Sequence, residues 1–166
     1  MNLIDCSYFY AGPLQIMNAK PTDDHDNNAY AVDEAITAYI ERYQDEFLEA
    51  MVGDGVKTVI TDYLAEREAN EEYVDEAVEE LCSKLRLSFA HYIYFKIVGD
   101  ANQTMTITGL VRLKSANEYQ SPRNRMVKVW NDMVRLNKDF VKWAETSDYD
   151  VFYHVNMITP INQFNL

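Results

Sequence analysis

Residues 87–98, LSFAHYIYFKIV, decide the fold. This stretch carries apolar or aromatic side chains on nearly every face of a helix, which is typical of a helix surrounded by other parts of the protein or buried in an interface. The same helix is expected to begin near residue 71, where the pattern is amphipathic and places Val74 on the buried side. Gly99 ends it. One long central helix is therefore the first prediction.

Three further stretches have the spacing of amphipathic helices. Residues 29–52 place apolar side chains three and four positions apart, and Gly53 follows where a left-handed residue closes a helix. Residues 55–68 repeat the pattern, with Val59 among the side chains expected to be buried. Residues 121–145 open with Ser-Pro, a frequent helix start. The sequence therefore predicts a mainly α fold, a four-helix bundle.

The 166 residues are enough for one domain with a sizeable core. We place the helical bundle at 29–146. Residues 1–28 lack helical periodicity and are expected to form an extended N-terminal arm, and residues 147–166 an extended C-terminal tail. Within the bundle, residues 100–121 contain MTITGLVRL, which indicates a hairpin or an extended loop between the third and fourth helices. Since neither the arms nor this loop has a buried periodic face, we expect all three to contact other chains.

The formal charge of −12 is unevenly distributed. Residues 1–80 hold 20 Asp and Glu against 4 Lys and Arg, whereas residues 81–166 hold 7 against 11. A chain with an acidic half and a basic half is suited to bind a copy of itself head to tail. Solvated helix faces of one sign explain the same numbers, so the sequence leaves both readings open.

The residue patterns point away from several classes of protein. The sequence contains no run of about 18 apolar residues of the kind that spans a membrane. A pI near 4.6 argues against general nucleic-acid binding. Cys6 and Cys82 are expected to be free, partly buried thiols. His25 in an acidic loop and His91 in the apolar helix lack the companions of a metal site. We therefore expect no catalytic, cofactor-binding or metal-binding residues, and no enzyme.

Four segments resemble, in the same order, uncharacterised proteins encoded among the structural genes of tailed bacteriophages and prophages. These proteins look like head–tail connector, or adaptor, proteins. The resemblance covers most of the chain and rests on an aromatic helix pattern. The segments are IDCSYFYAGPLQI, ITAYIERYQDEFLEAMVGDGV, SFAHYIYFKIV and NRMVKVWNDMVRLNKDF.

The resemblance implies a structural virion protein that forms a homo-oligomeric ring between the portal and the tail. Its partners would be the portal protein and other neck or tail proteins. It would be made in the bacterial cytoplasm and located in the neck of the virion. DNA would pass through the ring without specific binding, and an acidic lumen would repel the phosphates. The alternatives are another neck or tail component, such as a stopper or tail-completion protein, and a non-viral helical interaction module.

Candidate interface residues follow from the charge split, the irregular loop and the tail. Twelve Tyr, two Trp and seven Met exceed what a core of this size requires, and such residues are enriched at protein–protein interfaces. The acidic side is expected to face basic residues of a neighbour. The candidates are Glu72, Glu76, Glu79, Thr104, Thr106, Leu110, Arg112, Lys114, Arg123, Arg125, Lys128, Phe152, Tyr153 and Phe164.

Overall fold

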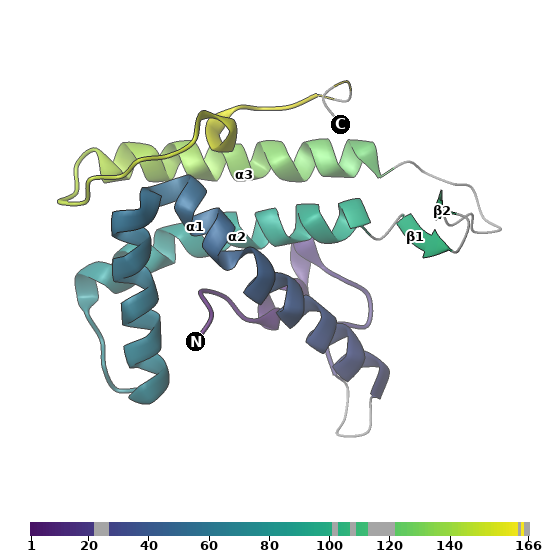
Figure 1. The fold of residues 1–166 in the computed structure, drawn as a ribbon, viewed down its shortest axis with the longest axis horizontal. Coiled ribbons are helices and arrows are strands. Elements are labelled where there is room, and N and C mark those ends of the chain that lie inside the picture. The colour runs from purple at the N-terminus through teal and green to yellow at the C-terminus, as the bar shows by residue number, and fades with distance from the viewer. Residues whose placement is uncertain (22–26, 101–102, 107–108, 113–121, 163, 165–166) are drawn as a thin grey trace.

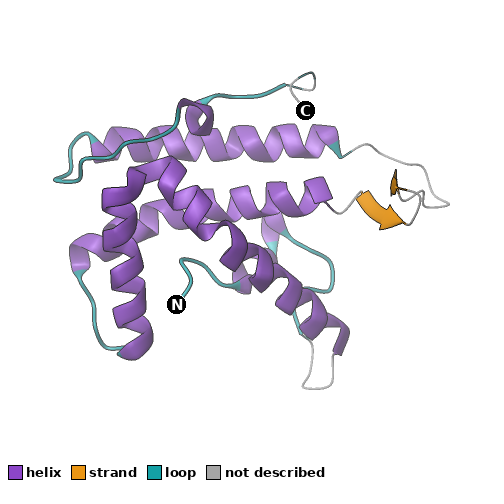
Figure 2. Ribbon diagram, viewed as in Figure 1, coloured by secondary structure: helices purple, strands orange, loops and turns teal. Residues whose placement is uncertain are grey.

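A central helix flanked by two others forms the body of the protein. The structure is a computed structural model, and it describes residues 1–21, 27–100, 103–106, 109–112, 122–162 and 164. The helices are α1 (Asn27–Ala69), α2 (Glu76–Asp100) and α3 (Arg123–Ala144). Helices α2 and α3 lie antiparallel and side by side, and α1 crosses α2 (Figure 1). The mainly α fold is thus confirmed (Figure 2).

The four-helix bundle is not confirmed, because the two helices expected at 29–52 and 55–68 form the two limbs of α1. Gly53 joins the limbs with a non-helical backbone, φ 75° and ψ 168°. The first limb runs obliquely to α2, and the second turns away from it after the bend (Figure 1). Val59 lies on the second limb and is 42% exposed, so its expected burial is wrong.

The bend at Gly53 interrupts the helical hydrogen bonds and frees carbonyl groups of the preceding turn. The tail supplies replacement donors. The backbone N–H of Phe152 donates to the Val52 carbonyl at 3.3 Å, and that of His154 donates to the Ala50 carbonyl at 2.7 Å. A Cβ atom at Gly53 would lie 3.1 Å from the Phe152 Cβ. Glycine is therefore required both for the positive φ and for the close approach of the tail.

The central helix α2 begins five residues later than expected. Asp75 caps it, since its Oδ1 accepts from the backbone N–H of Ala77 and Val78 at 3.1 and 3.2 Å. Residues 71–75 form a turn and a short irregular segment instead of a helical turn. Val74, which was expected on a buried face, therefore lies outside the helix and is 51% exposed.

The core gathers around the aromatic second half of α2, as its pattern indicated. The rings of Phe47 and Phe89 are 5.0 Å apart between α1 and α2, and both side chains are fully buried. Residues of the N-terminal arm complete this core, among them Leu3, Ile4 and Phe9. The arm contains two short 3-10 helices, η1 (Cys6–Phe9) and η2 (Gly12–Leu14), so it is less extended than expected.

A short hairpin and a tail complete the chain. Strands β1 (Gln103–Thr106) and β2 (Gly109–Arg112) pair antiparallel, with Met105 opposite Leu110. They extend beyond the ends of α2 and α3 (Figure 1). The tail runs back along α3 and includes a 3-10 helix, η3 (Val155–Ile158).

Gly53→Ala is expected to lower the free energy of unfolding by about 1–3 kcal/mol, because alanine is strained at positive φ and its Cβ would press on Phe152. Urea denaturation measures the change.

The matched control is Gly55→Ala. Gly55 lies in the same helix, without a positive φ and with no atom within 4 Å of a new Cβ, so this change should raise the free energy of unfolding by up to about 1 kcal/mol. Equal effects of the two substitutions would contradict the role given to the bend.

Candidate assembly surfaces

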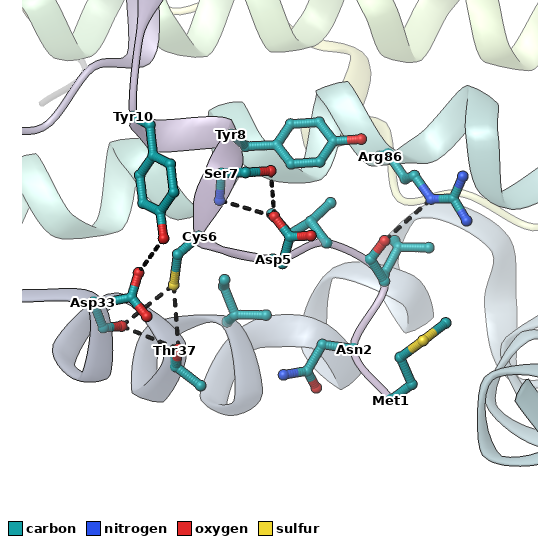
Figure 3. Close-up of a pocket in the computed structure, with 13 residues that line it drawn as sticks. Met1, Asn2, Asp5, Cys6, Ser7, Tyr8, Tyr10, Asp33, Thr37 and Arg86 are labelled. Atoms are coloured by element: carbon teal, nitrogen blue, oxygen red, sulfur yellow. Dashed lines mark hydrogen bonds between the residues drawn. The ribbon is translucent and has the colours of Figure 1, made fainter. Parts of the chain in front are cut away.

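A cleft lies where the N-terminal arm crosses α1. It has a volume of about 700 Å³ and is lined by all of the first ten residues of the arm except Phe9, together with residues of α1 and α2. Figure 3 shows Tyr10 and Cys6 pointing to α1, where the Tyr10 hydroxyl donates to Asp33 Oδ1 at 2.7 Å. Cys6 Sγ lies 3.3 Å from the Asp33 carbonyl and 3.2 Å from Thr37 Oγ1.

Two side chains in this cleft, Cys6 and Tyr10, are held in their protonated forms. Burial raises the pKa of the Cys6 thiol to about 11, and the hydrogen bond to Asp33 raises the pKa of Tyr10 to about 12. At neutral pH the thiol is therefore a poor nucleophile. Among the described residues, no group of three or more His, Cys, Asp or Glu is arranged to hold a metal ion. We interpret the cleft as the seam that fixes the arm to the body.

Arg86 ties the arm to the start of α2. Its guanidinium forms two hydrogen bonds with the Glu79 carboxylate, at 2.6 and 3.0 Å, and its Nε donates to the Leu3 carbonyl at 3.2 Å. The Tyr63 hydroxyl donates to Glu79 at 2.7 Å. These bonds hold the pKa of Glu79 below its usual value, with Arg86 as the main cause. Glu79 is thus engaged inside the chain, which the sequence pattern did not indicate.

A second tie fixes the tail to α3. The Asn131 side chain makes two hydrogen bonds with the backbone of Ile161, at 3.0 and 2.9 Å, and Trp130 Nε1 donates to the Thr159 carbonyl at 3.0 Å. Asn137 is fully buried; it accepts from the Ser88 hydroxyl and donates to the Met157 carbonyl. The polar side chains of α3 therefore bind backbone groups of the tail.

Sequence reasoning missed these Asn residues. Asn137 occupies a position within the apolar face of α3, and a polar residue there was the available signal, because a buried amide requires partners. Which partners it finds depends on the path of the tail, and no sequence pattern defines that path.

The basic candidates lie at one end of the paired helices. Arg123, Arg125 and Lys128 are exposed near the start of α3. Arg125 also donates to the Pro13 carbonyl at 2.7 Å and to the Tyr94 hydroxyl at 3.1 Å, so it contributes to its own fold. Strands β1 and β2 contain the candidates Thr104, Thr106, Leu110 and Arg112. Lys114 lies outside the described residues, as does the acidic loop that holds His25.

The acidic candidates lie at the opposite end, because α2 and α3 are antiparallel. Glu72 is exposed in the turn before α2, and Glu76 is exposed in its first turn. The tail candidate Tyr153 lines a cleft with Ala144 and Glu145 at the end of α3 and is 37% exposed. Phe152 approaches Gly53 and is 67% exposed. Phe164 is almost fully exposed at the far end of the tail.

The acidic end is extensive. Seven exposed carboxylates surround the start of α2 and the end of α3. They outnumber the nearby basic side chains, Lys84 and Lys142. These carboxylates belong to Glu71, Glu72, Glu76, Glu80, Glu145, Asp148 and Asp150. The structure thus converts the charge split of the sequence into two ends of opposite sign.

Comparisons of the chain with protein-family models, with characterised proteins and with solved structures found no match. Within the described ranges, no helix is long and apolar enough to cross a lipid bilayer.

Acid should weaken the tie between Arg86 and Glu79. Because the pKa of Glu79 is lowered in the folded state, its ion pair contributes stability above the unfolded pKa near 4.5, and this is lost as the pH falls through the folded pKa. Glu79→Gln is therefore expected to lower the free energy of unfolding by about 1–3 kcal/mol at pH 7. The difference from the natural chain should shrink below pH 4.

Urea denaturation between pH 7 and pH 3 measures this difference. Glu41→Gln, which changes an exposed carboxylate in the middle of the first limb of α1, is the control and should follow the natural chain closely at every pH. A Glu79→Gln difference that is constant with pH would show that the ion pair does not carry the effect.

Proposed function

We propose that this protein is a structural subunit of a tailed-phage particle that forms an oligomeric ring between the portal and the tail. In this proposal it acts as a head–tail connector through which DNA passes without specific binding. The resemblance of the four segments supplies the phage context. The observation that carries the assembly itself is the placement of acidic and basic residues at opposite ends of the α2–α3 pair.

Two ends of opposite charge favour heterologous contact. A ring requires each subunit to present two different surfaces that complement each other, so that one end of a copy binds the other end of the next. The acidic end holds Glu72 and Glu76, and the basic end holds Arg123 and Lys128. Attraction between such ends sets the orientation of the subunits, while aromatic and apolar contacts supply most of the affinity.

Interaction with the helix dipole explains the charge at only one of the two ends. The acidic residues at the start of α2 lie near the positive end of its dipole, where they are favourable. The start of α3 has Arg123 and Arg125 and no acidic residue in its first turn, which opposes its dipole. Arg125 is held at this place by its bonds to Pro13 and Tyr94, and we assign the role in binding to Arg123 and Lys128.

Passage of DNA is compatible with the acidic surface of α1. Its first limb exposes Glu34, Glu41 and Asp45, and a lumen lined by such residues would repel phosphate groups. The proposal places this face toward the lumen of the ring.

The mass of the assembled particle tests the proposal most directly. Light scattering and native mass spectrometry should detect a discrete oligomer, and a particle reconstruction would distinguish a connector from a stopper or tail-completion protein. A monodisperse monomer at high concentration would overturn the ring and favour the helical interaction module.

Reversing the basic end should slow assembly. The double variant Arg123→Glu, Lys128→Glu is expected to assemble at least several-fold more slowly than the natural chain at low salt, with a smaller difference at high salt, because salt screens exposed charges over about 8–10 Å. Mixing it with the variant Glu72→Lys, Glu76→Lys should partly restore the rate. Arg125 is left unchanged because its contacts belong to the fold.

The control is Arg135→Glu, Lys138→Glu, which makes the same charge change at exposed positions in the middle of α3, away from both charged ends. It should assemble close to the natural rate. If both double variants behave alike, or if salt has no effect on either, the charge split is only a solvated surface.

A further inference from the structure

A pocket of about 270 Å³ lies at the acidic end of the molecule, between the first turns of α2 and the turn that follows α3. Glu80 contributes one carboxylate from α2, and Asp148 contributes another from the turn. Trp143 and Tyr149 supply the aromatic part of the lining, and their ring centroids are 6.5 Å apart. The volume is below the usual range of small-molecule pockets, about 300–1,000 Å³, and suits a single inserted side chain.

Hydrogen bonds within the chain hold the walls of this pocket in place. Trp143 Nε1 donates to Glu80 Oε1 at 3.2 Å, which fixes the indole ring against α2. In the turn, the Ser147 hydroxyl donates to the Ala144 carbonyl at 2.8 Å and accepts from the Tyr149 N–H at 3.2 Å. The pocket is therefore formed before a partner binds, which lowers the entropic cost of binding.

Aromatic rings beside carboxylates attract a cation. Lys84 shows this within the chain, because its ammonium group lies 5.7 Å from the centroid of the Trp143 ring and 3.8 Å from Glu80 Oε1. Lys84 does not line the pocket, and among the described residues no basic side chain pairs with Asp148. Burial raises the pKa of Tyr149, and nearby carboxylates, Asp148 among them, add to this effect. The pocket thus has a negative potential and a carboxylate available for a second cation.

The opposite end of α3 offers a matching cation. Lys128 is exposed there, and no carboxylate of the described residues pairs with its ammonium group. Arg125, by contrast, is held by Tyr94 and Pro13 of its own chain. Along α3, Lys128 and Trp143 are about 22 Å apart at 1.5 Å per residue, so the lysine cannot reach the pocket of its own copy.

We propose that this pocket binds the Lys128 side chain of a second copy, with the ammonium group between the Trp143 ring and the Asp148 carboxylate. The inference rests on the proposed function, because it names the contact through which neighbouring subunits meet. The apolar stem of the lysine packs against the aromatic rings while the charge meets the carboxylate. Because the pocket and Lys128 lie at opposite ends of α3, the contact repeats from each copy to the next and gives a ring when the rotation closes.

A double-mutant cycle on the full-length chain tests the contact. Lys128→Met removes the charge and keeps an apolar stem, and Asp148→Asn removes the negative charge at nearly constant shape. Each change is expected to raise the concentration at which the oligomer dissociates by about three- to tenfold, as measured by light scattering. The double variant should dissociate no more readily than the weaker of the two single variants, because the two groups bind each other.

Matched controls make the same chemical changes away from the contact. Lys138→Met lies in the middle of α3, Asp45→Asn lies on the first limb of α1, and both positions are exposed. Each should leave the dissociation concentration within about twofold of the natural value. If the effects of Lys128→Met and Asp148→Asn multiply in the double variant, or if neither exceeds its control, the two groups do not meet and the proposed contact is wrong.

Zero-length cross-linking provides the second measurement. A carbodiimide joins an amine to a carboxylate that touches it, so the natural assembled chain should yield a peptide that links Lys128 to Asp148 or Glu80. A mixture of isotope-labelled and unlabelled chains should show that the link joins two copies. An assembled chain that lacks this link overturns the pocket contact and leaves the ring standing, whereas a natural chain that stays monomeric overturns both.

Discussion

The bend at Gly53 is the constraint on which the rest of the structure depends. It turns α1 through a residue with positive φ, and the carbonyl groups of Ala50 and Val52 then bond to the backbone of the tail. Buried backbone groups require partners, so a bent α1 and an attached tail are two parts of one arrangement. The close approach of Phe152 to Gly53 leaves no space for a side chain at the bend.

The attachment of the tail continues from the bend along α3. Asn137 joins α2, α3 and the tail through Ser88 and the Met157 carbonyl, in a place from which water is excluded. Each group of this network satisfies another, which makes the position of the tail specific as well as stable.

The antiparallel packing of α2 and α3 gives the surface its polarity. It brings the acidic start of α2 beside the acidic end of α3, and the end of α2 beside the basic start of α3. Opposite ends suit a subunit that repeats head to tail. By contrast, the cleft under the N-terminal arm holds groups whose hydrogen bonds secure the arm, and Arg86 is engaged by Glu79 and Leu3. The proposed function therefore rests on the polarity of the surface that the described residues form.

The sequence by itself determined the helices and the charge of each half. The aromatic pattern of residues 87–98 predicted a surrounded helix, and α2 lies between α1 and α3, because apolar periodicity depends only on local spacing. Tertiary structure decided what Gly53 does: the sequence marked the end of a helix there, yet whether the chain stops or bends depends on the donors that the distant tail brings. It also decided that Glu79 and Arg125 serve their own chain, since their partners at Arg86, Tyr63, Pro13 and Tyr94 come together only after the arm and helices have packed.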